Sequence, residues 1–340
     1  MYEQGNIRPP SEASSLLVRV TRNCPWNQCT FCMSYKGATF SRRTVAEVKK
    51  DIDSLAREYE GYAVRTVFLQ DGDTLVLKTE DVLEIIRYIK QKFPAIERIT
   101  SYARAPTLKR RTVEELKQLK EAGLTRLHVG MESGSEKVLK MIRKGITEDA
   151  IITGGRHVKE AGIELSEYIM PGVGGKTLSE EHALETARLL NMIRPDFIRV
   201  RTFAMHPRSP MQQMVENGTF VPMTDEEVIG EIRLLLQNLN KMHSYFCCGD
   251  FGLNLLMHVN GYLDENKEQM LKDLDEYLFL SKEQKQAYSL LKRSSYGSLP
   301  IDVVRNEDTM KQIRPELEKI EKTEKGGIDG HVNRLLSRLA

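Results

Sequence analysis

The sequence predicts an α/β protein built on a parallel sheet. Short apolar segments rich in branched residues alternate with amphipathic segments of roughly 12 to 18 residues, the lengths of strands and helices. Gly123 and Gly162 stand where a helix ends and the next strand begins. Six consecutive strand–helix units with right-handed crossovers give a parallel sheet, either doubly wound or curled into a partial barrel.

The spacing of apolar residues predicts the bounds of each strand and helix. The expected strands are 16–22, 64–70, 97–103, 125–131, 163–170 and 196–204. The helices between them are expected at 43–59, 79–92, 112–122, 135–142, 148–161 and 178–193. From Thr224, a plausible N-cap, the pattern becomes helical, with helices near 225–242, 265–278, 281–294 and 306–322. We therefore expect a lead-in over 1–14, an α/β core over 15–223 and a helical region over 224–340.

Composition narrows the class of protein. The 340 residues include 50 Lys plus Arg and 48 Asp plus Glu, a net charge of +2, which does not mark a nucleic-acid or membrane binder. No apolar run reaches the ~18 residues of a transmembrane helix, and the first residues lack a secretory pattern. We expect a cytoplasmic protein, and five cysteines, three of them crowded together, suit a metal in a reducing compartment better than disulfides.

The three crowded cysteines follow the first expected strand. Cys24, Cys29 and Cys32 have the spacing C-x4-C-x2-C, and no other Cys or His precedes His128. A structural zinc site needs four ligands, whereas thiolates also suit copper(I) and iron–sulfur clusters. A cluster held by three cysteines keeps one iron open to another ligand, while zinc or redox cysteines are the alternatives.

The loops at the carboxyl ends of the expected strands carry the remaining candidates. Parallel barrels keep their chemistry on these loops. The loops after the second, fourth and fifth strands contain glycine, the second and fourth also contain an acid, and the loop after the first strand carries the cysteines, whereas the loops at the opposite end are ordinary solvated turns. This grouping predicts one ligand-binding face. His128 lies inside the fourth strand among apolar neighbours, and we expect it to be a core histidine.

The cysteine stretch N-C-P-W-N-Q-C-T-F-C-M resembles the cluster loop of the radical S-adenosylmethionine (SAM) enzymes. The resemblance implies a [4Fe-4S] cluster on Cys24, Cys29 and Cys32, SAM on its fourth iron, and Phe31 against the adenine. It also implies a partial (β/α)6 TIM-like barrel with a helical C-terminal extension. The commonest spacing in that family is C-x3-C-x2-C, so this chain has one extra residue between its first two cysteines.

Three further segments extend the resemblance to SAM-binding residues. Asp71, Gly72 and Asp73 stand where relatives carry a glycine-rich motif that receives the SAM ammonium, with two acids replacing backbone carbonyls. The segment L-H-V-G-M-E-S-G-S resembles the coproporphyrinogen-dehydrogenase-like and Elongator-catalytic-subunit-like branches. That resemblance implies that Glu132 meets the ribose and that Lys144 meets the carboxylate. Glu167 is a further candidate for the ribose, and P-G-V-G-G after it resembles the turn that supports the adenine.

Three residues are weaker catalytic candidates. Cys247 and Cys248 are adjacent and suit a hydrogen-atom donor, a substrate ligand or a redox pair, although buried cysteine is also common packing. His206 leaves the sixth expected strand, toward the substrate opening that the resemblance implies.

The sequence thus predicts a radical SAM enzyme that cleaves SAM and abstracts hydrogen from a small-molecule substrate. An electron donor such as a flavodoxin- or ferredoxin-like protein would reduce the cluster. One alternative is a radical SAM enzyme that modifies RNA, which would need a basic surface that the net charge does not indicate. The other is a non-catalytic iron–sulfur or zinc scaffold protein.

Overall fold

The computed structural model describes residues 2–250, 252–295 and 298–339 and divides into two compact units. The first unit comprises Met1–Met131, Arg143–Tyr168 and Pro195–Phe197. The second comprises Glu132–Ile142, Ile169–Arg194 and Ile198–Ala340.

The first unit contains five neighbouring strands in the order β1-β4-β5-β6-β7. They are β1 (Leu16–Arg19), β4 (Thr66–Gln70), β5 (Arg98–Ala103), β6 (Leu124–Glu132) and β7 (Glu164–Ile169). The pairs β1–β4, β4–β5 and β5–β6 are parallel, with Leu17 opposite Phe68 and Phe68 opposite Thr100. Strands buried on both faces read as continuous apolar runs, and Val67, Phe68 and Leu69 are all fully buried. The predicted parallel α/β class is confirmed.

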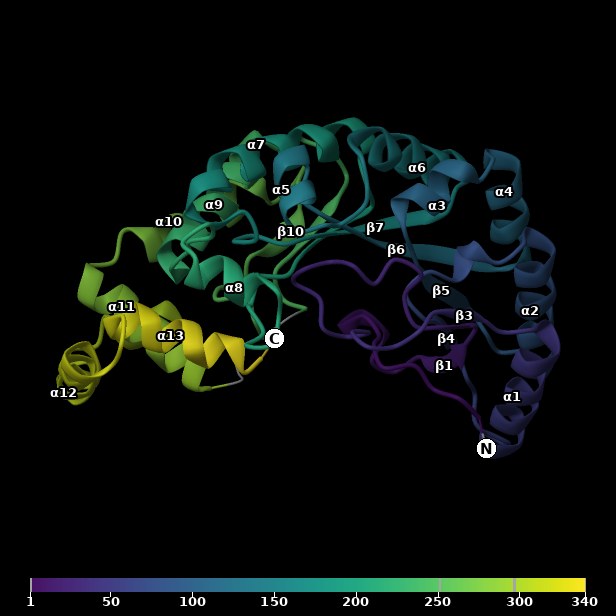
Figure 1. Ribbon diagram of the computed structural model, residues 1–340, viewed down its shortest axis with the longest axis horizontal. Coiled ribbons are helices and arrows are strands. Elements are labelled where there is room, and N and C mark those ends of the chain that lie inside the picture. Colours follow the sequence, from purple (N-terminus) through teal and green to yellow (C-terminus); the bar gives the residue numbers. More distant parts are fainter. Residues whose placement is uncertain (1, 251, 296–297, 340) are drawn as a thin grey trace. The chain divides into compact units, whose positions relative to one another are not determined.

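Helices connect these strands and cover one side of them. They are α1 (Val45–Glu58), α2 (Thr79–Lys92), α3 (Ala105–Arg110), α4 (Val113–Ala122) and α6 (Glu148–Glu160). Figure 1 shows α1, α2 and α4 side by side along the strands, and α2 packs against both of the others. Helix α2 buries Val82, Ile85, Ile86 and Ile89, which share one face because of their spacing. Helix α3 was not expected from the sequence, although Pro106 near its start is a helix-initiation signal.

The first expected strand is interrupted after Arg19. Val20 donates its amide hydrogen to the carbonyl of Gln70, and the chain then leaves the parallel sheet. Residues Thr21–Arg22 form β2, which pairs antiparallel with β3 (Ser41–Arg42). This short pair closes the base of the loop that carries the three cysteines.

The second unit contains three neighbouring strands and most of the C-terminal helices. The strands are β8 (Phe197–Val200), β9 (Tyr245–Cys247) and β10 (Asn260–Tyr262). The expected strand 196–204 ends at Val200, because Thr202 bonds through its amide and hydroxyl to the Asn254 side chain, with no strand partner. The helices are α5 (Glu136–Met141), α7 (Gly175–Ile193), α8 (Met211–Glu216), α9 (Asp225–Asn238), α10 (Lys267–Leu278), α11 (Lys282–Ser294), α12 (Glu307–Thr323) and α13 (Gly327–Ser337).

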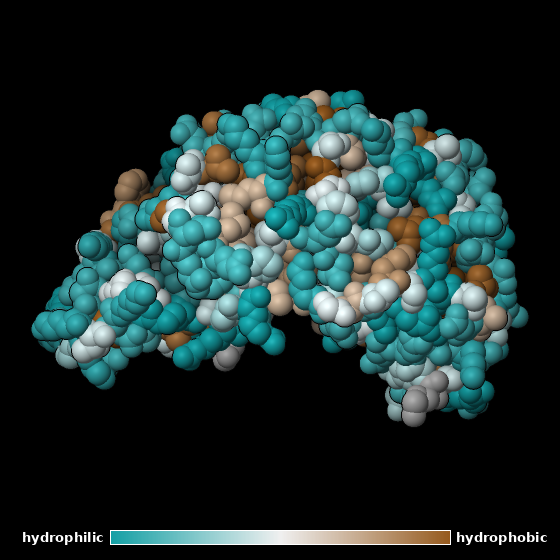
Figure 2. Space-filling model, viewed as in Figure 1, coloured by the Kyte–Doolittle hydropathy of each residue, from teal (hydrophilic) through white to brown (hydrophobic). Residues whose placement is uncertain are grey.

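Local signals fix the start of α9 and the packing of the last helices. Thr224 and Glu227 form the predicted capping box, while the helix ends at Asn238, four residues earlier than expected. Helices α11, α12 and α13 pack against one another, as Figure 1 shows at its yellow end. Their visible surface is largely hydrophilic (Figure 2), as expected for amphipathic helices that share one buried side. Among the described residues, no helix combines the length and the apolar character that crossing a membrane requires.

A buried ion pair joins the N-terminal segment to the strands of the first unit. Glu12 ends a short 3-10 helix, Pro10–Glu12, and is fully buried. One of its carboxylate oxygens lies 3.3 Å from His128 Nε2, and the other lies 3.3 Å from the Arg98 guanidinium. His128 is fully buried, so the expectation of a core histidine is confirmed. Burial alone would raise the pKa of Glu12, but hydrogen bonds with His128 and Ser15 lower it to about 2.

The depressed pKa of Glu12 predicts a dependence of stability on pH. Because the folded pKa lies below the ordinary value of 4.5, the carboxylate stabilises the fold above pH 4.5. That contribution is lost as the pH falls toward 2. We expect Glu12→Gln to lower the free energy of unfolding by about 1–3 kcal/mol at pH 7. The difference from wild type should shrink at pH 3 in urea titrations of the apo-protein. An equal difference at both pH values would contradict this assignment.

Candidate cofactor site

The cysteine loop, residues 23–40, is built between β2 and β3 of the first unit. Cys24, Cys29 and Cys32 are partly exposed and form no disulfide. Asn23 and Asn27 have left-handed backbones, with φ of 68° and 47°, a conformation that asparagine tolerates better than most residues. The Asn27 side chain donates to the carbonyls of Tyr35 and Ala38, at 2.6 and 3.1 Å. These side-chain bonds replace regular secondary structure and hold the three thiols on one loop.

Asp71 fixes the start of this loop. Its carboxylate is fully buried, and Oδ2 accepts hydrogen bonds from the Arg19 guanidinium at 2.8 Å and from the Asn23 amide at 3.0 Å. Oδ1 accepts from the Tyr35 hydroxyl at 3.1 Å. Burial raises the pKa of that hydroxyl, and the Asp71 charge raises it further. Both carboxylate oxygens therefore act on the loop itself, and the prediction that Asp71 receives the SAM ammonium stays a prediction.

Gly72 brings the second loop into contact with the first cysteine. A Cβ at Gly72 would lie 3.2 Å from Cys24 Cβ and 3.3 Å from Cys24 Cα. A side chain here would be tighter against Cys24 than ordinary van der Waals contact, so glycine suits this close approach of the backbone after β4. Asp73 is the next residue in the chain, so its backbone lies beside this contact with the cysteine loop.

Asp73 has the electrostatic character of a cation-binding group. It is fully buried, and its Oδ2 accepts a hydrogen bond of 2.6 Å from the Thr107 hydroxyl. Burial raises its pKa to about 6, against the opposing effects of Thr107 and Arg104. In the described part of the chain, Asp73 Oδ1 has no hydrogen-bond partner. A buried acceptor of this kind costs free energy unless a donor occupies the space beside it, and a ligand ammonium is such a donor.

Phe31 and Lys144, two predicted cofactor residues far apart in sequence, are brought together. Lys144 Nζ lies 5.9 Å from the centroid of the Phe31 ring. The turn that carries Lys144 is left-handed on both sides, with φ of 50° at Arg143 and 65° at Gly145. A cation and an aromatic ring at the cysteine loop suit a ligand with a carboxylate and a purine.

Trp26 joins that turn to the cysteine loop, and the sequence analysis did not single it out. Its indole Nε1 donates to the Arg143 carbonyl at 2.7 Å, and a Cβ at Gly145 would lie 2.2 Å from its ring. Arg104 lies 5.3 Å from the same ring and donates to the Lys144 carbonyl at 3.0 Å. Trp26 is the only tryptophan of the chain and lies between two of the three cysteines. This position was the feature of the sequence that could have pointed to it. Nothing in the sequence distinguished Arg104.

The two remaining predicted ribose contacts lie in different units. Glu167 belongs to β7 in the first unit and is almost fully buried. Glu132 ends β6 and belongs to the second unit, where its carbonyl accepts a hydrogen bond of 2.9 Å from the Met170 amide. Its φ of 61° is unusual for a residue with a side chain, and such strain gathers at functional sites.

The weaker catalytic candidates all lie in the second unit. His206 Nδ1 accepts a hydrogen bond of 3.1 Å from the Arg208 amide. Cys247 and Cys248 are buried and form no disulfide. Burial raises the pKa of Cys247 to about 11 and that of Cys248 well above its ordinary value, with Asp250 acting in the same direction. Protonated thiols are poor nucleophiles. The roles suggested by the sequence, a hydrogen-atom donor, a substrate ligand or a redox pair, stay predictions.

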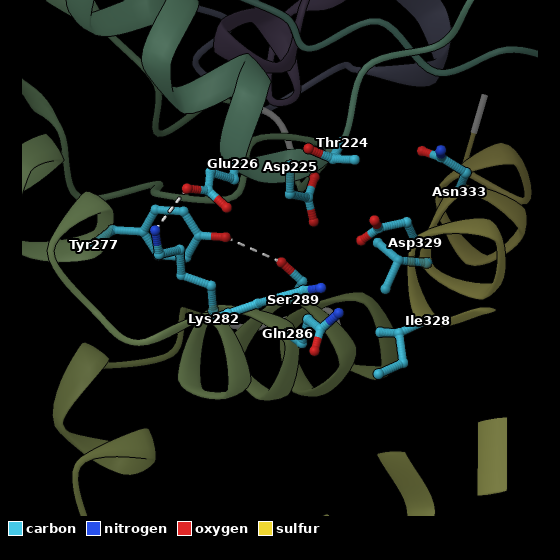
Figure 3. A pocket seen from close by; sticks show the side chains of 12 residues that line it. Thr224, Asp225, Glu226, Tyr277, Lys282, Gln286, Ser289, Ile328, Asp329 and Asn333 are labelled. Atoms are coloured by element: carbon cyan, nitrogen blue, oxygen red, sulfur yellow. Dashed lines mark hydrogen bonds and ion pairs between the residues drawn. The ribbon is translucent and has the colours of Figure 1, made fainter. Parts of the chain in front are cut away.

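A charged pocket of the second unit is separate from every predicted site residue. Figure 3 shows it between the starts of α9 and α13 and the side of α11. Its volume is about 60 Å³, room for about two water molecules. Glu226 bonds to Lys285 at 2.6 Å, and Asp225 bonds to the buried Arg293 at the same distance. These pairs hold the C-terminal helices together.

Comparison with known proteins gives the class and then the family. Three thiols, none of them in a disulfide, on the loop after the first strand of a parallel α/β sheet indicate the class of metal-binding α/β proteins. Residues 18–190, just over half of the chain, match the Radical SAM superfamily, and the chain belongs to it. Members of this superfamily use a [4Fe-4S] cluster and SAM.

Individual relatives agree with the branches that the sequence suggested. The chain is 24% identical over 186 residues to the heme chaperone HemW of Bacillus subtilis, covering 54% of this chain and 48% of that protein. It is 24% identical over 117 residues to the tRNA uridine(34) acetyltransferase of Methanocaldococcus infernus, covering 34% and 22%. The chain thus spans about half or less of the length of these relatives.

A solved structure supports the fold. The coproporphyrinogen III oxidase HemN of Escherichia coli, a radical SAM enzyme, aligns with a TM-score of 0.53 at 18% identity. The alignment covers 66% of this chain and 52% of that one. Together with the family match, it confirms the predicted fold class, a partial barrel of the radical SAM type.

The arrangement around Asp71 predicts a loss of loop structure when its charge is removed. Asp71→Asn removes the nearer of the two carboxylates that pair with the Arg19 guanidinium, while Glu3 stays at 3.6 Å, and we expect the free energy of unfolding to fall by about 3 kcal/mol. Limited proteolysis of the apo-protein should show faster cleavage within residues 23–40. Asp53→Asn is the control: it removes the charge of a partly exposed carboxylate on α1 that pairs with Lys92, keeps an acceptor for the Tyr88 hydroxyl and should stay close to wild type. Equal cleavage rates in all three proteins would refute the role given to Asp71.

Proposed function

We propose that this protein is a radical SAM enzyme that holds its cluster on Cys24, Cys29 and Cys32 and abstracts hydrogen from a small-molecule substrate. The observation that carries the proposal is the set of three thiols, none of them in a disulfide, on one loop of the first unit. The other two cysteines of the chain, Cys247 and Cys248, belong to the second unit. A three-thiol donor set fits a cluster that keeps one iron for a ligand such as SAM.

The surrounding residues fit the parts of SAM. Asp73 Oδ1, which has no hydrogen-bond partner in the described structure, suits the SAM ammonium. Gly72 lets the backbone before Asp73 lie close to Cys24. Lys144, beside Phe31, suits the carboxylate, while the Phe31 ring suits the adenine. Glu167, which belongs to the same unit as the cysteines, suits a ribose hydroxyl as an acceptor, and the same role for Glu132 rests on the resemblance alone.

When bound, the reduced cluster supplies one-electron cleavage of SAM, which is the chemistry that the protein itself lacks. The chain contributes binding, orientation and exclusion of water. Asp71 holds the thiols in place through Arg19 and Tyr35, so the loop is ordered before the ligands arrive. Radical SAM enzymes generally need an electron donor, and we propose a flavodoxin- or ferredoxin-like protein as the partner here.

RNA modification is the second candidate function. The similarity to a tRNA uridine(34) acetyltransferase favours it, whereas the net charge of +2 gives no sign of a strongly basic surface. Binding of bulk tRNA measured between 50 and ~200 mM salt separates the two, because phosphate contacts make affinity fall steeply with salt.

The proposed cluster site predicts the result of anaerobic reconstitution. We expect the wild-type protein to bind about four iron and four sulfide per chain and, with dithionite, to convert SAM to 5′-deoxyadenosine. Replacing Cys24, Cys29 or Cys32 by Ala should abolish both, whereas Cys247→Ala should retain the iron. Zinc in place of iron, or a fully loaded cluster that forms no 5′-deoxyadenosine, would favour a scaffold protein.

The ammonium site predicts a specific defect in SAM binding. Asp73→Asn removes the negative charge while keeping the hydrogen bond to Thr107, so we expect the Kd for SAM to rise about tenfold or more. Iron content should stay at the wild-type level because the assigned ligands are the three thiols. Asp149→Asn, at an exposed ion pair on α6, is the matched control. An unchanged Kd in Asp73→Asn would exclude it from the ammonium site.

A further inference from the structure

A chain of buried polar groups crosses the second unit, outside the residues assigned so far. It consists of Ser133 after β6, His182 on α7 and Glu231 on α9, none more than 3% exposed. His182 Nδ1 lies 2.8 Å from Ser133 Oγ, and His182 Nε2 lies 3.5 Å from Glu231 Oε1. Buried groups of this kind are costly unless their partners are fixed, so the three elements are held in register.

This chain connects two loops that both carry predicted SAM contacts. At one end, Ser133 follows Glu132, and its hydroxyl oxygen accepts a hydrogen bond of 3.0 Å from the Ser135 amide. At the other end, Glu231 Oε1 accepts a hydrogen bond of 2.7 Å from the Gly172 amide. Gly172 belongs to the glycine-rich turn after β7 and has a left-handed φ of 87°.

The loop that carries Glu132 needs external support. Glu132 has a φ of 61°, which is unfavourable for a residue with a Cβ unless its surroundings hold it there. Gly134 is pinned against α7, since its amide donates to Thr186 Oγ1 at 2.8 Å. A Cβ at Gly134 would lie 2.3 Å from the Glu185 carbonyl. Helix α7 therefore shapes this loop through Ser133 and Gly134 together.

The protonation states suit a neutral arrangement. Burial lowers the pKa of His182 to about 4, so the imidazole is uncharged at neutral pH. Burial raises the pKa of Glu231 to about 7, although hydrogen bonds from Ser179 and Gly172 favour its charged form. In the described part of the chain, His182 Nε2 and Glu231 Oε2 make no hydrogen bond of ordinary geometry. A neutral imidazole is suited to link a serine with a carboxyl group without bringing a charge into the core.

We propose that His182, which lies between Ser133 and Glu231, is a positioning residue that sets the Glu132 loop and the Gly172 turn in the shape that binds the nucleoside of SAM. The inference rests on the proposed function, because it assumes that these two loops contact SAM. The proposal adds two residues, His182 and Glu231, that act on the SAM-binding loops through Ser133 and Gly172 and are not themselves assigned to the cluster or the ligand.

The test compares SAM binding with cluster loading. Radiolabelled SAM is titrated by equilibrium dialysis into the anaerobically reconstituted full-length protein, and iron content and thermal melting are measured on the same samples. We expect Ser133→Ala and His182→Asn to raise the Kd for SAM about tenfold at unchanged iron content. Glu231→Gln keeps an oxygen at the position of Oε1, which can still accept from the Gly172 amide and faces His182 Nε2 as before, so its Kd should stay within about threefold of wild type. The control, Glu180→Gln, changes an exposed carboxylate on α7 and should have no effect.

Failure of the inference is distinguishable from failure of the proposed function. If wild-type protein with a full cluster binds no SAM, the proposed function fails. If Glu132→Ala weakens SAM binding while folded Ser133→Ala and His182→Asn keep the wild-type Kd, only the positioning role is overturned. Should His182→Asn not fold, Ser133→Ala decides, because it removes a single oxygen from the same chain. Loss of iron in parallel with loss of SAM binding would indicate a general structural role and would also overturn the proposal.

Discussion

The buried ion pair between Asp71 and Arg19 is the interaction on which the cofactor site of the first unit depends. The cysteine loop has no regular secondary structure of its own between β2 and β3, so its shape comes from side-chain bonds. Asp71 supplies three of them, through Arg19, the Asn23 amide and Tyr35. A carboxylate without exposure to water is stable only when such donors surround it. The same donors therefore keep the charge buried and the thiols in place.

Two acids one residue apart have opposite surroundings. Asp71 is saturated with hydrogen-bond donors, whereas Asp73 has a raised pKa and an oxygen with no hydrogen-bond partner in the described structure. The sequence D-G-D-T gave both acids the same role, because spacing alone does not say which carboxylate turns toward the protein. The structure distinguishes a residue that orders the loop from one that is available to a ligand.

In the second unit, a buried cluster of polar groups also supports a loop, but its members need not be charged. Ser133, His182 and Glu231 come from three elements separated by about 50 residues each, and they meet in a buried site. Burial moves the pKa values of the histidine and the acid in opposite directions, so neither needs to carry a full charge there. A backbone that is strained at Glu132 can then be supported without an exposed ion pair.

The sequence by itself determined the parallel α/β class, the positions of most helices and the family. These features follow from hydrophobic period, caps and cysteine spacing, which are local in the chain. The cofactor roles of Phe31 and Lys144 come only from resemblance and stay predictions. Tertiary structure alone decided the break after β1, the contact of Trp26 with the turn at Gly145 and the different hydrogen bonding of Asp71 and Asp73. These depend on side chains separated by 25 to 120 residues, roughly, and no local pattern encodes which of them meet.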